Sequence, residues 1–599
     1  MRKICCVLAI LPVFLCGLST PASAQARAAA TTAGQATHNP AWWKNAVIYE
    51  IYPRSFKDSN GDGIGDLNGI TSRLDYLQKL GVNAIWLTPI YPSPQVDFGY
   101  DISNYEAIDS QYGTMGDFEH LVAEAKKHNI RVIMDLVLNH TSDQDPWFKE
   151  SASSRTNPKA DWYVWRDAKM VNGHREPPNN WISLFGGSAW QWDPARRQYY
   201  YHRFYVQQPD LNWNNPQVRK AMYDVARFWI RKGVAGFRLD AITALFEDPR
   251  DRNEPYILGP NGKPLINAYG DKEVTSIYTD NLPKVHDVLR QLRQVTDQAS
   301  GGKAVLIGET YLPSVADLRK MYGANNDELQ LPMDMQVGFI NRFDVSLFRR
   351  RIDQAETELD GNQPLFVFDN HDNPRWDRYG SSTPDAPPFA YNPHHEDIGR
   401  VIATILFASR DTALMYYGDE IGMVTTPPTR KQDVRDPIGI RGWPKEKGRD
   451  GERTPMQWNA TPVAGFSSPG VKTWLPIPPS YKTVNVAAEE HNPNSMFHWY
   501  EPLIALKKQD PALHEGSETM LDTSNDRVFS WLRKAPDGEA VVVACNFTAQ
   551  PQTVRLDLKA QGVHGTGLKT LLKTPGAPDA QSLDSVMLGP YGVYIGEVR

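Results

Sequence analysis

The sequence predicts an α/β protein: a (β/α)8 barrel with an inserted subdomain after the third strand and an all-β sandwich at the C-terminus. Two observations lead to this prediction. From residue 47 onward, short apolar runs rich in β-branched residues alternate with stretches of helical spacing, such as 70–77 and 118–128. After about residue 520 the helical stretches stop and only strand-like runs follow.

The apolar runs supply the strands of the barrel. They are too apolar for a sheet with one face in water, so we expect a parallel sheet covered by helices. Eight such strands with intervening helices close into a (β/α)8, or TIM, barrel. An open doubly wound sheet is the alternative, although no GxGxxG loop follows the first run. The runs lie at 47–52, 84–87, 132–136, 234–239, 304–307, 331–337 (the weakest), 365–368 and 412–416.

Two segments break the alternation of strands and helices. Residues 139–213 are rich in Trp, Pro and Asn and follow the third strand, and residues 424–500 have a similar character. Insertions after barrel strands emerge on the catalytic face, so both should shape the pocket. The expected domains are the barrel at 39–138 and 214–519, an inserted subdomain at 139–213, a pocket-lining insertion at 424–500 and the sandwich at 520–599.

The N-terminus has the pattern of an export signal. Arg2 and Lys3 precede an apolar run that ends at Leu18, and a small-residue cleavage site ends at Ala24. The apolar run is short for a membrane span. We therefore expect a signal peptide at 1–24 and a flexible leader at 25–38, and a processed protein that is periplasmic or extracellular and has no membrane attachment.

The composition and charge disfavour several classes of function. The 599 residues are 41% hydrophobic and 22% charged, which is typical of folded proteins, and the net charge is −6. Nucleic acid is disfavoured as a main partner because phosphate binding needs a basic face. The 17 Trp and 26 Tyr are side chains that suit stacking on sugar rings, and they suit protein cores equally well.

Polar residues stand at the ends of strands that are otherwise apolar. His140 follows the third strand, Arg238 and Asp240 end the fourth, Glu309 follows the fifth, and His371 and Asp372 follow the seventh. Barrel enzymes place catalysis at these strand ends, so the side chains are expected to converge. A helix cap or an ion pair would explain any one of the carboxylates, but three on separate strands indicate a catalytic site.

Such a set fits cleavage of a glycosidic bond with retention of configuration. One carboxylate acts as the nucleophile and a protonated acid serves the leaving oxygen, with the two groups about 5 to 5.5 Å apart. Burial or a neighbouring negative charge must raise the pKa of the acid, while a cation such as Arg238 keeps the nucleophile ionised. A third carboxylate with histidines can bind sugar hydroxyls more tightly as charge develops on the ring.

The strand-end segments also resemble a known family. They are similar, in the same order, to the four short signature regions of the α-amylase family, glycoside hydrolase family 13, and the likeness runs from about Trp42 to the C-terminus. Gln-Pro-Asp-Leu-Asn at 208–212 and Thr-Pro-Met-Gln-Trp at 454–458 resemble its oligo-1,6-glucosidase and α-glucosidase branch. The four signature-like segments are 135–140, 236–240, 308–309 and 368–372.

The resemblance implies a role for each site residue. Asp240 would be the nucleophile, Glu309 the acid/base and Asp372 the stabiliser of the transition state. Asp97 would bind hydroxyls of the terminal glucose, Tyr100 would stack beneath its ring, and Arg449 would pair with Asp97 to close the pocket. The implied substrate-binding set is Asp97, Tyr100, His140, Arg238, His371 and Arg449.

A second constellation follows the first strand. In Asp-Ser-Asn-Gly-Asp-Gly-Ile-Gly-Asp at 58–66, oxygen-bearing residues alternate and a Gly stands sixth, as in the first half of a calcium-binding loop. The pattern then departs from an EF-hand, because Gly69 stands where Glu is needed. The α-glucosidase branch implies a structural Ca²⁺ here, with Mg²⁺ and a metal-free turn as alternatives. The implied ligands are Asp58, Asn60, Asp62, the Ile64 carbonyl and Asp66.

Together these features predict a retaining, exo-acting α-glucosidase that releases glucose from the non-reducing end of short α-glucosides. The reaction would pass through a covalent Asp240 intermediate, and a closed pocket would exclude the middle of a starch chain. In this branch, Val after the nucleophile accompanies α-1,6 cleavage. Here the residue is Ala241, so we expect α-1,4 substrates such as maltose.

Other functions remain as alternatives. Transfer of glucose to a sugar, as in trehalose or isomaltulose synthases, shares the covalent intermediate. An α-1,6-specific oligo-1,6-glucosidase would differ in linkage alone. A non-catalytic scaffold relative would typically lack triad carboxylates, whereas this chain has all three. The expected partners are small-molecule sugars, with the protein as a monomer or homodimer.

Overall fold

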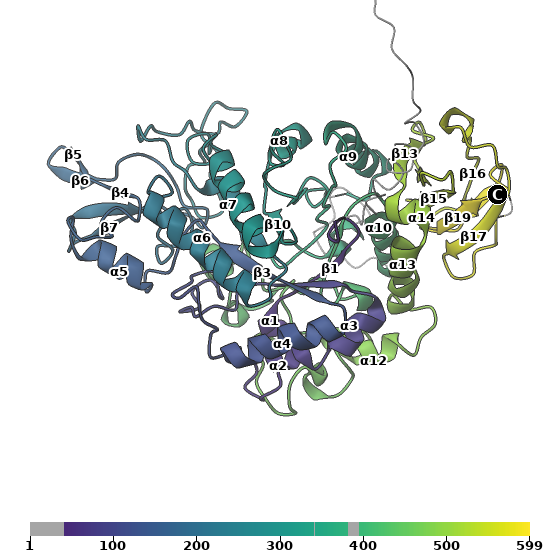
Figure 1. Cartoon of the computed structure of the whole chain (residues 1–599), viewed down its shortest axis with the longest axis horizontal. Helices are drawn as coiled ribbons and strands as arrows, with labels where there is room; N and C mark the ends of the chain where they lie inside the picture. Colours follow the sequence, from purple (N-terminus) through teal and green to yellow (C-terminus); the bar gives the residue numbers. More distant parts are fainter. Residues whose placement is uncertain (1–40, 341, 381–393, 581) are drawn as a thin grey trace, which may run out of the picture. The chain divides into compact units, whose positions relative to one another are not determined.

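A parallel sheet forms the centre of the fold (Figure 1). The computed structural model describes residues 41–340, 342–380, 394–580 and 582–599; the expected signal peptide and leader lie outside them. In these described residues the strands of the sheet are β1 (Val47–Ile51), β2 (Ala84–Leu87), β3 (Arg131–Val137), β9 (Gly236–Asp240), β10 (Val305–Gly308), β11 (Leu331–Pro332) and β12 (Ala413–Tyr416).

The strands follow one another around the sheet in chain order. The spatial order is β11-β10-β9-β3-β2-β1-β12, every pair is parallel, and Val47 pairs with Ala413 to join the first strand to the last. All residues of β1, β2 and β9 are buried, which agrees with a sheet covered on both faces.

Backbone hydrogen bonds through residues 364–367 close the sheet into a barrel. Asp334 N donates to Leu365 O (2.8 Å), Val367 N donates to Asp334 O (3.2 Å), and Thr412 N donates to Pro364 O (3.0 Å). The sequence predicted full strands at 331–337 and 365–368. The structure instead has a two-residue strand and one bridge, Asp334 to Phe366. Pro332 and Pro364 have no N–H to donate to a ladder, which shortens the pairing there.

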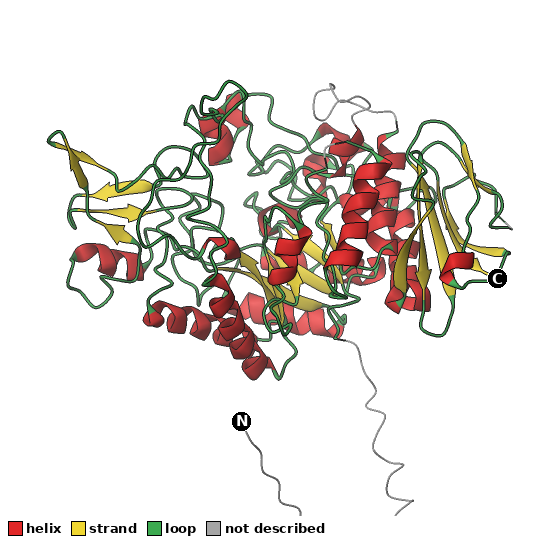
Figure 2. Ribbon diagram, turned by 90° about the horizontal axis from the view of Figure 1, so that it is seen from above, coloured by secondary structure: helices red, strands yellow, loops and turns green. Residues whose placement is uncertain are grey.

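Helices surround the central strands, as Figure 2 shows from above. In α6, Asn215 caps the N-terminus through Gln217 N, Pro216 occupies the first turn, and the buried residues lie on one face. The predicted (β/α)8 barrel is therefore confirmed. The longer helices around it are α4 (Met115–Lys127), α6 (Pro216–Arg231), α7 (Val285–Ser300), α9 (Val345–Glu358), α10 (His395–Ala408) and α13 (Phe497–Gln509).

The segment after β3 carries two small antiparallel sheets. Part of it has an aromatic core of its own, in which Trp181 packs on Trp190 and Tyr201. Within the described residues, one sheet has the order β4-β8-β7 and the other is the hairpin β5-β6. Their bounds are β4 (Trp165–Arg166), β5 (Lys169–Val171), β6 (His174–Glu176), β7 (Trp190–Asp193) and β8 (Gln198–Tyr201).

The C-terminal segment is all-β, as predicted. Among its described residues, an antiparallel sheet in the order β13-β14-β15-β19-β17 packs on a second sheet, β16-β18, around a shared apolar core. Trp531 and Arg533 of β14 donate to Ala408 O at the end of α10, so this segment is hydrogen-bonded to the barrel. The strands are β13 (Ser517–Leu521), β14 (Val528–Lys534), β15 (Ala540–Asn546), β16 (Gln552–Val554), β17 (Leu568–Lys573), β18 (Val586–Leu588) and β19 (Val593–Val598).

Membrane-spanning helices were sought along the same described ranges. None of the helices there is both long enough and apolar enough to cross a bilayer.

Candidate active site

A cavity of about 460 Å³ lies at the C-terminal ends of the barrel strands. Phe185 and Phe204 of the segment after β3, Tyr311 and Ile438 form part of its wall. Arg238 and His371 are fully buried behind it and contact the residues that line it. Seven of the nine expected catalytic and substrate-binding residues line the cavity: Asp97, Tyr100, His140, Asp240, Glu309, Asp372 and Arg449.

Arg238 holds the two carboxylates expected to act on the glycosidic bond. It stands two residues before Asp240 on β9, so both side chains point to the same face of the strand. Nη1 donates to Asp240 Oδ1 at 2.7 Å, and Nη2 forms an ion pair with Glu309 Oε1 at 2.6 Å. Glu309 Oε2 also accepts from Ala241 N at 2.8 Å. The shared guanidinium keeps the two carboxylates close together.

Burial sets the protonation of this cluster. It raises the pKa of Glu309 to about 7 and the pKa of Asp240 above its usual range, although Arg238 lowers both. Asp135 of β3 is a third carboxylate on the same guanidinium, 3.1 Å from Nη1. Three carboxylates around one cation leave an excess of negative charge, so the cluster retains a proton near neutrality and titrates as a unit.

Asp372 differs from the other two carboxylates because it has its own cations. Arg449 Nη1 and Arg453 Nη2 lie 2.9 and 2.6 Å from its Oδ1. Burial would raise the pKa of Asp372, but His371, whose Nε2 lies 3.3 Å from Oδ2, and the guanidiniums of Arg449 and Arg453 outweigh burial and hold it well below its usual range. Burial lowers the pKa of His371 below 6.5, so that imidazole is neutral at pH 7 and the two guanidiniums supply the positive charge.

A buried layer of hydrogen bonds supports Tyr100 and His371. The two rings stack with centroids 5.5 Å apart, and Tyr100 Oη lies 2.7 Å from His371 Nε2 and donates to Asp135 Oδ2 at 3.1 Å. His371 Nδ1 lies 2.6 Å from Glu50 Oε1. Burial raises the pKa of Glu50 well above its usual range. The layer fixes the tyrosine ring at the wall of the cavity.

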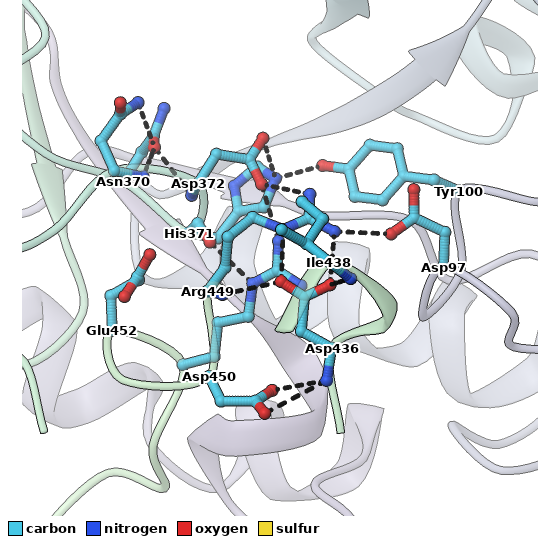
Figure 3. Close-up of polar contacts among 12 residues, drawn as sticks. Asp97, Tyr100, Asn370, His371, Asp372, Asp436, Ile438, Arg449, Asp450 and Glu452 are labelled. Carbon is cyan, nitrogen blue, oxygen red and sulfur yellow. Dashed lines mark hydrogen bonds and ion pairs between the residues drawn. The ribbon is translucent and has the colours of Figure 1, made fainter. Parts of the chain in front are cut away.

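Arg449 closes the cavity on the side of Asp97 (Figure 3). Its Nη2 lies 2.8 Å from Asp97 Oδ1, and its Nε lies 2.9 Å from Oδ2 of Asp436, which is fully buried. Gln208 donates to Asp97 Oδ2 at 3.3 Å and lies 3.1 Å from His140 Nε2. The segment after β3 thereby reaches the residues that would bind glucose.

Several residues of the site were not found from the sequence. Asp135 is the first residue of the signature-like segment 135–140. It lies on β3 and pairs in register with Arg238 on the neighbouring strand β9, so it could have been found from the sequence. Glu50 stands inside the first apolar run, 47–52, and not at its end. Asp436 and Arg453 lie in a long irregular segment, where periodicity says nothing about which side chains meet.

Ala241 has an unusual backbone conformation. Its φ is +44° and its ψ is +36°, in the left-handed region that residues with a Cβ seldom adopt. The turn points Ala241 N at Glu309 and places the Ala241 side chain at the wall of the cavity. Ala241 therefore orients the Glu309 carboxylate through its backbone N–H, and its side chain lines the cavity in which a substrate would bind.

The loop at 58–66 is a series of tight turns. Asp58 Oδ1 accepts from Gly61 N (2.7 Å), Asn60 Oδ1 accepts from Asp62 N (2.9 Å), and Asp62 Oδ1 accepts from Ile64 N (2.8 Å). No group of three or more His, Cys, Asp or Glu placed to hold a metal occurs in the described part of the chain. The donor set of side-chain and carbonyl oxygens is of the kind that a hard cation prefers. Asn60 Oδ1 and Asp62 Oδ1 accept one hydrogen bond each and keep a lone pair, whereas both oxygens of Asp58 already accept two, some of which a cation would replace.

The barrel and its paired carboxylates define a glycosidase of the barrel type. Residues 50–516 match the family described as alpha amylase, catalytic domain, and residues 519–595 match maltogenic amylase, C-terminal domain. The chain belongs to the α-amylase family, glycoside hydrolase family 13, and is a glycoside hydrolase.

Two curated relatives cover most of the chain. A probable alpha-glucosidase of Rhizobium meliloti (strain 1021) is 40% identical over 524 residues, which cover 86% of this chain and 91% of the relative. The oligo-1,6-glucosidase of Parageobacillus thermoglucosidasius is 35% identical over 591 residues, which cover 93% and 99%. The predicted likeness to this branch is confirmed.

Two solved structures are also similar. An alpha-glucosyl transfer enzyme has a TM-score of 0.82 and 36% identity, with 94% of this chain and 100% of that chain covered. The trehalulose synthase of Pseudomonas mesoacidophila MX-45 has a TM-score of 0.80 and 35% identity, with 93% and 99% covered. Hydrolases and transfer enzymes therefore share this architecture.

Proposed function

We propose that the protein is a retaining α-glucosidase that releases glucose from the non-reducing end of short α-glucosides. The observation that carries the proposal is the pairing of Asp240 and Glu309 through Arg238 in a cavity whose other side is closed by Asp97 and Arg449. The curated relatives are named α-glucosidase and oligo-1,6-glucosidase, which supports it.

In the first step Asp240 attacks the anomeric carbon of the terminal glucose. The bond from that carbon to the glycosidic oxygen breaks as Glu309 transfers its proton to the oxygen, and a glucosyl ester of Asp240 remains. Asp372 stays ionised because of its two arginines, so it can bind the sugar hydroxyls as positive charge develops on the ring.

In the second step water attacks the anomeric carbon of the glucosyl ester. Glu309, now a carboxylate, takes a proton from the water, the ester bond breaks, and glucose leaves in its original configuration. A sugar hydroxyl in place of water would give transfer of glucose to that sugar. The two similar structures named for glucosyl transfer and trehalulose synthesis support glucosyl transfer as a second candidate function. Product analysis on maltose, isomaltose, sucrose and starch distinguishes hydrolysis from transfer and tests both.

We propose α-1,4 linkage specificity on the basis of Ala241. Its methyl group lines the cavity beside the nucleophile, where Val would occupy more space. The closed side of the cavity favours a chain end over the middle of a polymer. We therefore expect activity on maltose and little activity on starch.

Glu309→Gln tests the division of roles between the two carboxylates. We expect activity on maltose to fall by about 10²- to 10⁴-fold, because glutamine cannot protonate the leaving oxygen. A 4-nitrophenyl α-glucoside needs little protonation, so it should still give a burst of nitrophenol equal to the enzyme concentration. Asp240→Asn should give no burst. Equal losses on both substrates with no burst from Glu309→Gln would contradict the assignment.

The rate should depend on pH through the same cluster. Glu309 must be protonated to act as the acid, and its pKa is about 7, so kcat/KM should fall as pH rises above about 7. Asp240 must be ionised, and burial raises its pKa to about 7 as well, so kcat/KM should also fall as pH drops below about 7 and should peak near neutral pH. A profile of kcat/KM on maltose between pH 4 and pH 9 that stays flat would be incompatible with these roles.

Ala241→Val tests linkage specificity. We expect the ratio of maltose to isomaltose activity to fall by about tenfold or more, since one or two methyl groups discriminate substrates by about 1–3 kcal/mol. The ratio is the quantity to measure, because a β-branched residue at positive φ also strains the turn. Ala241→Gly is the matched control, since it relieves the turn without filling the cavity. An unmoved ratio in Ala241→Val would show that this residue does not set linkage.

We also propose that the 58–66 loop binds Ca²⁺. Asp58, Asn60, Asp62, the Ile64 carbonyl and Asp66 would hold the ion, which would stabilise the loop and take no part in the reaction. Chelation should lower the Tm, because a ligand bound by the folded state alone stabilises that state. Adding Ca²⁺ back should restore the Tm more effectively than Mg²⁺. In Ca²⁺, Asp62→Asn should have a lower Tm than the parent, and in chelator the two proteins should have the same Tm. If the loop is a metal-free turn, neither chelation nor added Ca²⁺ should change the Tm.

Export to the periplasm or the medium, and a monomeric or homodimeric state, remain proposals from the sequence. Fractionation of the producing cells and light scattering of the purified protein test them.

A further inference from the structure

Asp436 lies directly behind Arg449 and outside the cavity lining (Figure 3). Its side chain is fully buried and makes three contacts with this one residue. Oδ2 accepts from Arg449 N at 2.7 Å and from Nε at 2.9 Å, and Oδ1 accepts from Nη2 at 3.1 Å. One carboxylate therefore holds both the backbone and the guanidinium of Arg449.

The surrounding chain holds Asp436 itself in place. Asp436 caps the short helix α11 (Pro437–Gly442) by accepting from Ile438 N, and Asp450 accepts from Asp436 N at 3.1 Å. Gly448 permits the close approach: its φ is +73°, and a Cβ there would lie 2.8 Å from Asp436 Oδ2. Gly448 and Asp450, which flank Arg449 in the chain, therefore both lie against Asp436.

The position of Asp436 determines where the rest of the guanidinium points. With Nε fixed on the buried side, Nη1 reaches Asp372 at 2.9 Å and Nη2 reaches Asp97 at 2.8 Å. Phe185 lies 5.6 Å from the guanidinium and covers one side of it. The guanidinium is planar, so once its Nε is fixed, Nη1 and Nη2 can reach Asp372 and Asp97 in one orientation only.

We propose that Asp436 is a positioning residue that holds Arg449 at the wall of the cavity and so keeps space for the terminal glucose between Asp97 and Asp372. This inference rests on the proposed function, which places glucose there. Without Asp436, the flexible arginine would keep partners on the cavity side alone. The attraction of Asp97 and Asp372 would then draw its charge into the space that the sugar needs.

The test is a double-mutant cycle between Asp436 and Arg449. Asp436→Asn has nearly the same shape but one acceptor oxygen. It must therefore lose either the two contacts that Oδ2 makes with Arg449 N and Nε, or the two that Oδ1 makes with Ile438 N and Arg449 Nη2. We expect kcat/KM for maltose to fall by about 10- to 100-fold, mainly through a higher KM, because a buried hydrogen bond to a charged group is lost. In an Arg449→Ala background the same substitution should change kcat/KM less than twofold.

Asp433→Asn is the matched control. Asp433 lies three residues earlier, pairs with Arg430 at 2.6 Å near the surface, and is not among the described residues that line the cavity. It should leave KM and the Tm unchanged. If Asp436→Asn instead lowers the Tm and kcat/KM equally in both backgrounds, its role is structural and the inference is wrong. The inference is also overturned if kcat/KM does not change.

A crystal structure of Asp436→Asn separates this inference from the proposed function. The inference expects the guanidinium of Arg449 to have moved away from residue 436 and into the cavity space between Asp97 and Asp372, whatever the substrate is. An arginine that stays in place overturns the inference. A parent enzyme that releases no glucose from α-glucosides overturns the proposed function alone.

Discussion

The buried guanidinium of Arg238 is the interaction on which the catalytic end of the barrel depends. It is fully buried, and Asp135, Asp240 and Glu309 from three neighbouring strands surround it. Burying such a charge is costly unless it is paired, so the strands must bring all of these carboxylates to one level. Under the proposed function this arrangement would place the nucleophile beside the acid, and it keeps a proton in the cluster near neutral pH.

A second arginine organises the opposite side of the cavity in the same way. Arg449 lies among Asp97, Asp372 and Asp436, but these residues come from loops after the strands. The first cluster therefore has the rigidity of the sheet, whereas the second depends on contacts between segments far apart in the chain. This division places the bond-breaking groups on the barrel and glucose recognition on the loops, which is where members of one family can differ.

The choice between water and a sugar as the acceptor depends on the space beyond Asp240 and Glu309. Phe185 and Phe204 from the segment after β3 form the cavity wall near Arg449 and His140, and Tyr311 lines the cavity as well. The proposed catalytic pair could serve hydrolysis or transfer, because both would pass through the same covalent intermediate.

The sequence alone determined the barrel, the all-β C-terminal segment and the strand-end carboxylates. Strand alternation and the rule that barrel strands end at one face bring Asp240, Glu309 and Asp372 together without any knowledge of tertiary contacts. Only the tertiary structure revealed Glu50, Arg453 and Asp436, the left-handed turn at Ala241, and the short pairing near Pro332 and Pro364. These features depend on backbone geometry and on tertiary contacts, such as that of Glu50 with His371, which is 321 residues away, and local periodicity carries no information about either.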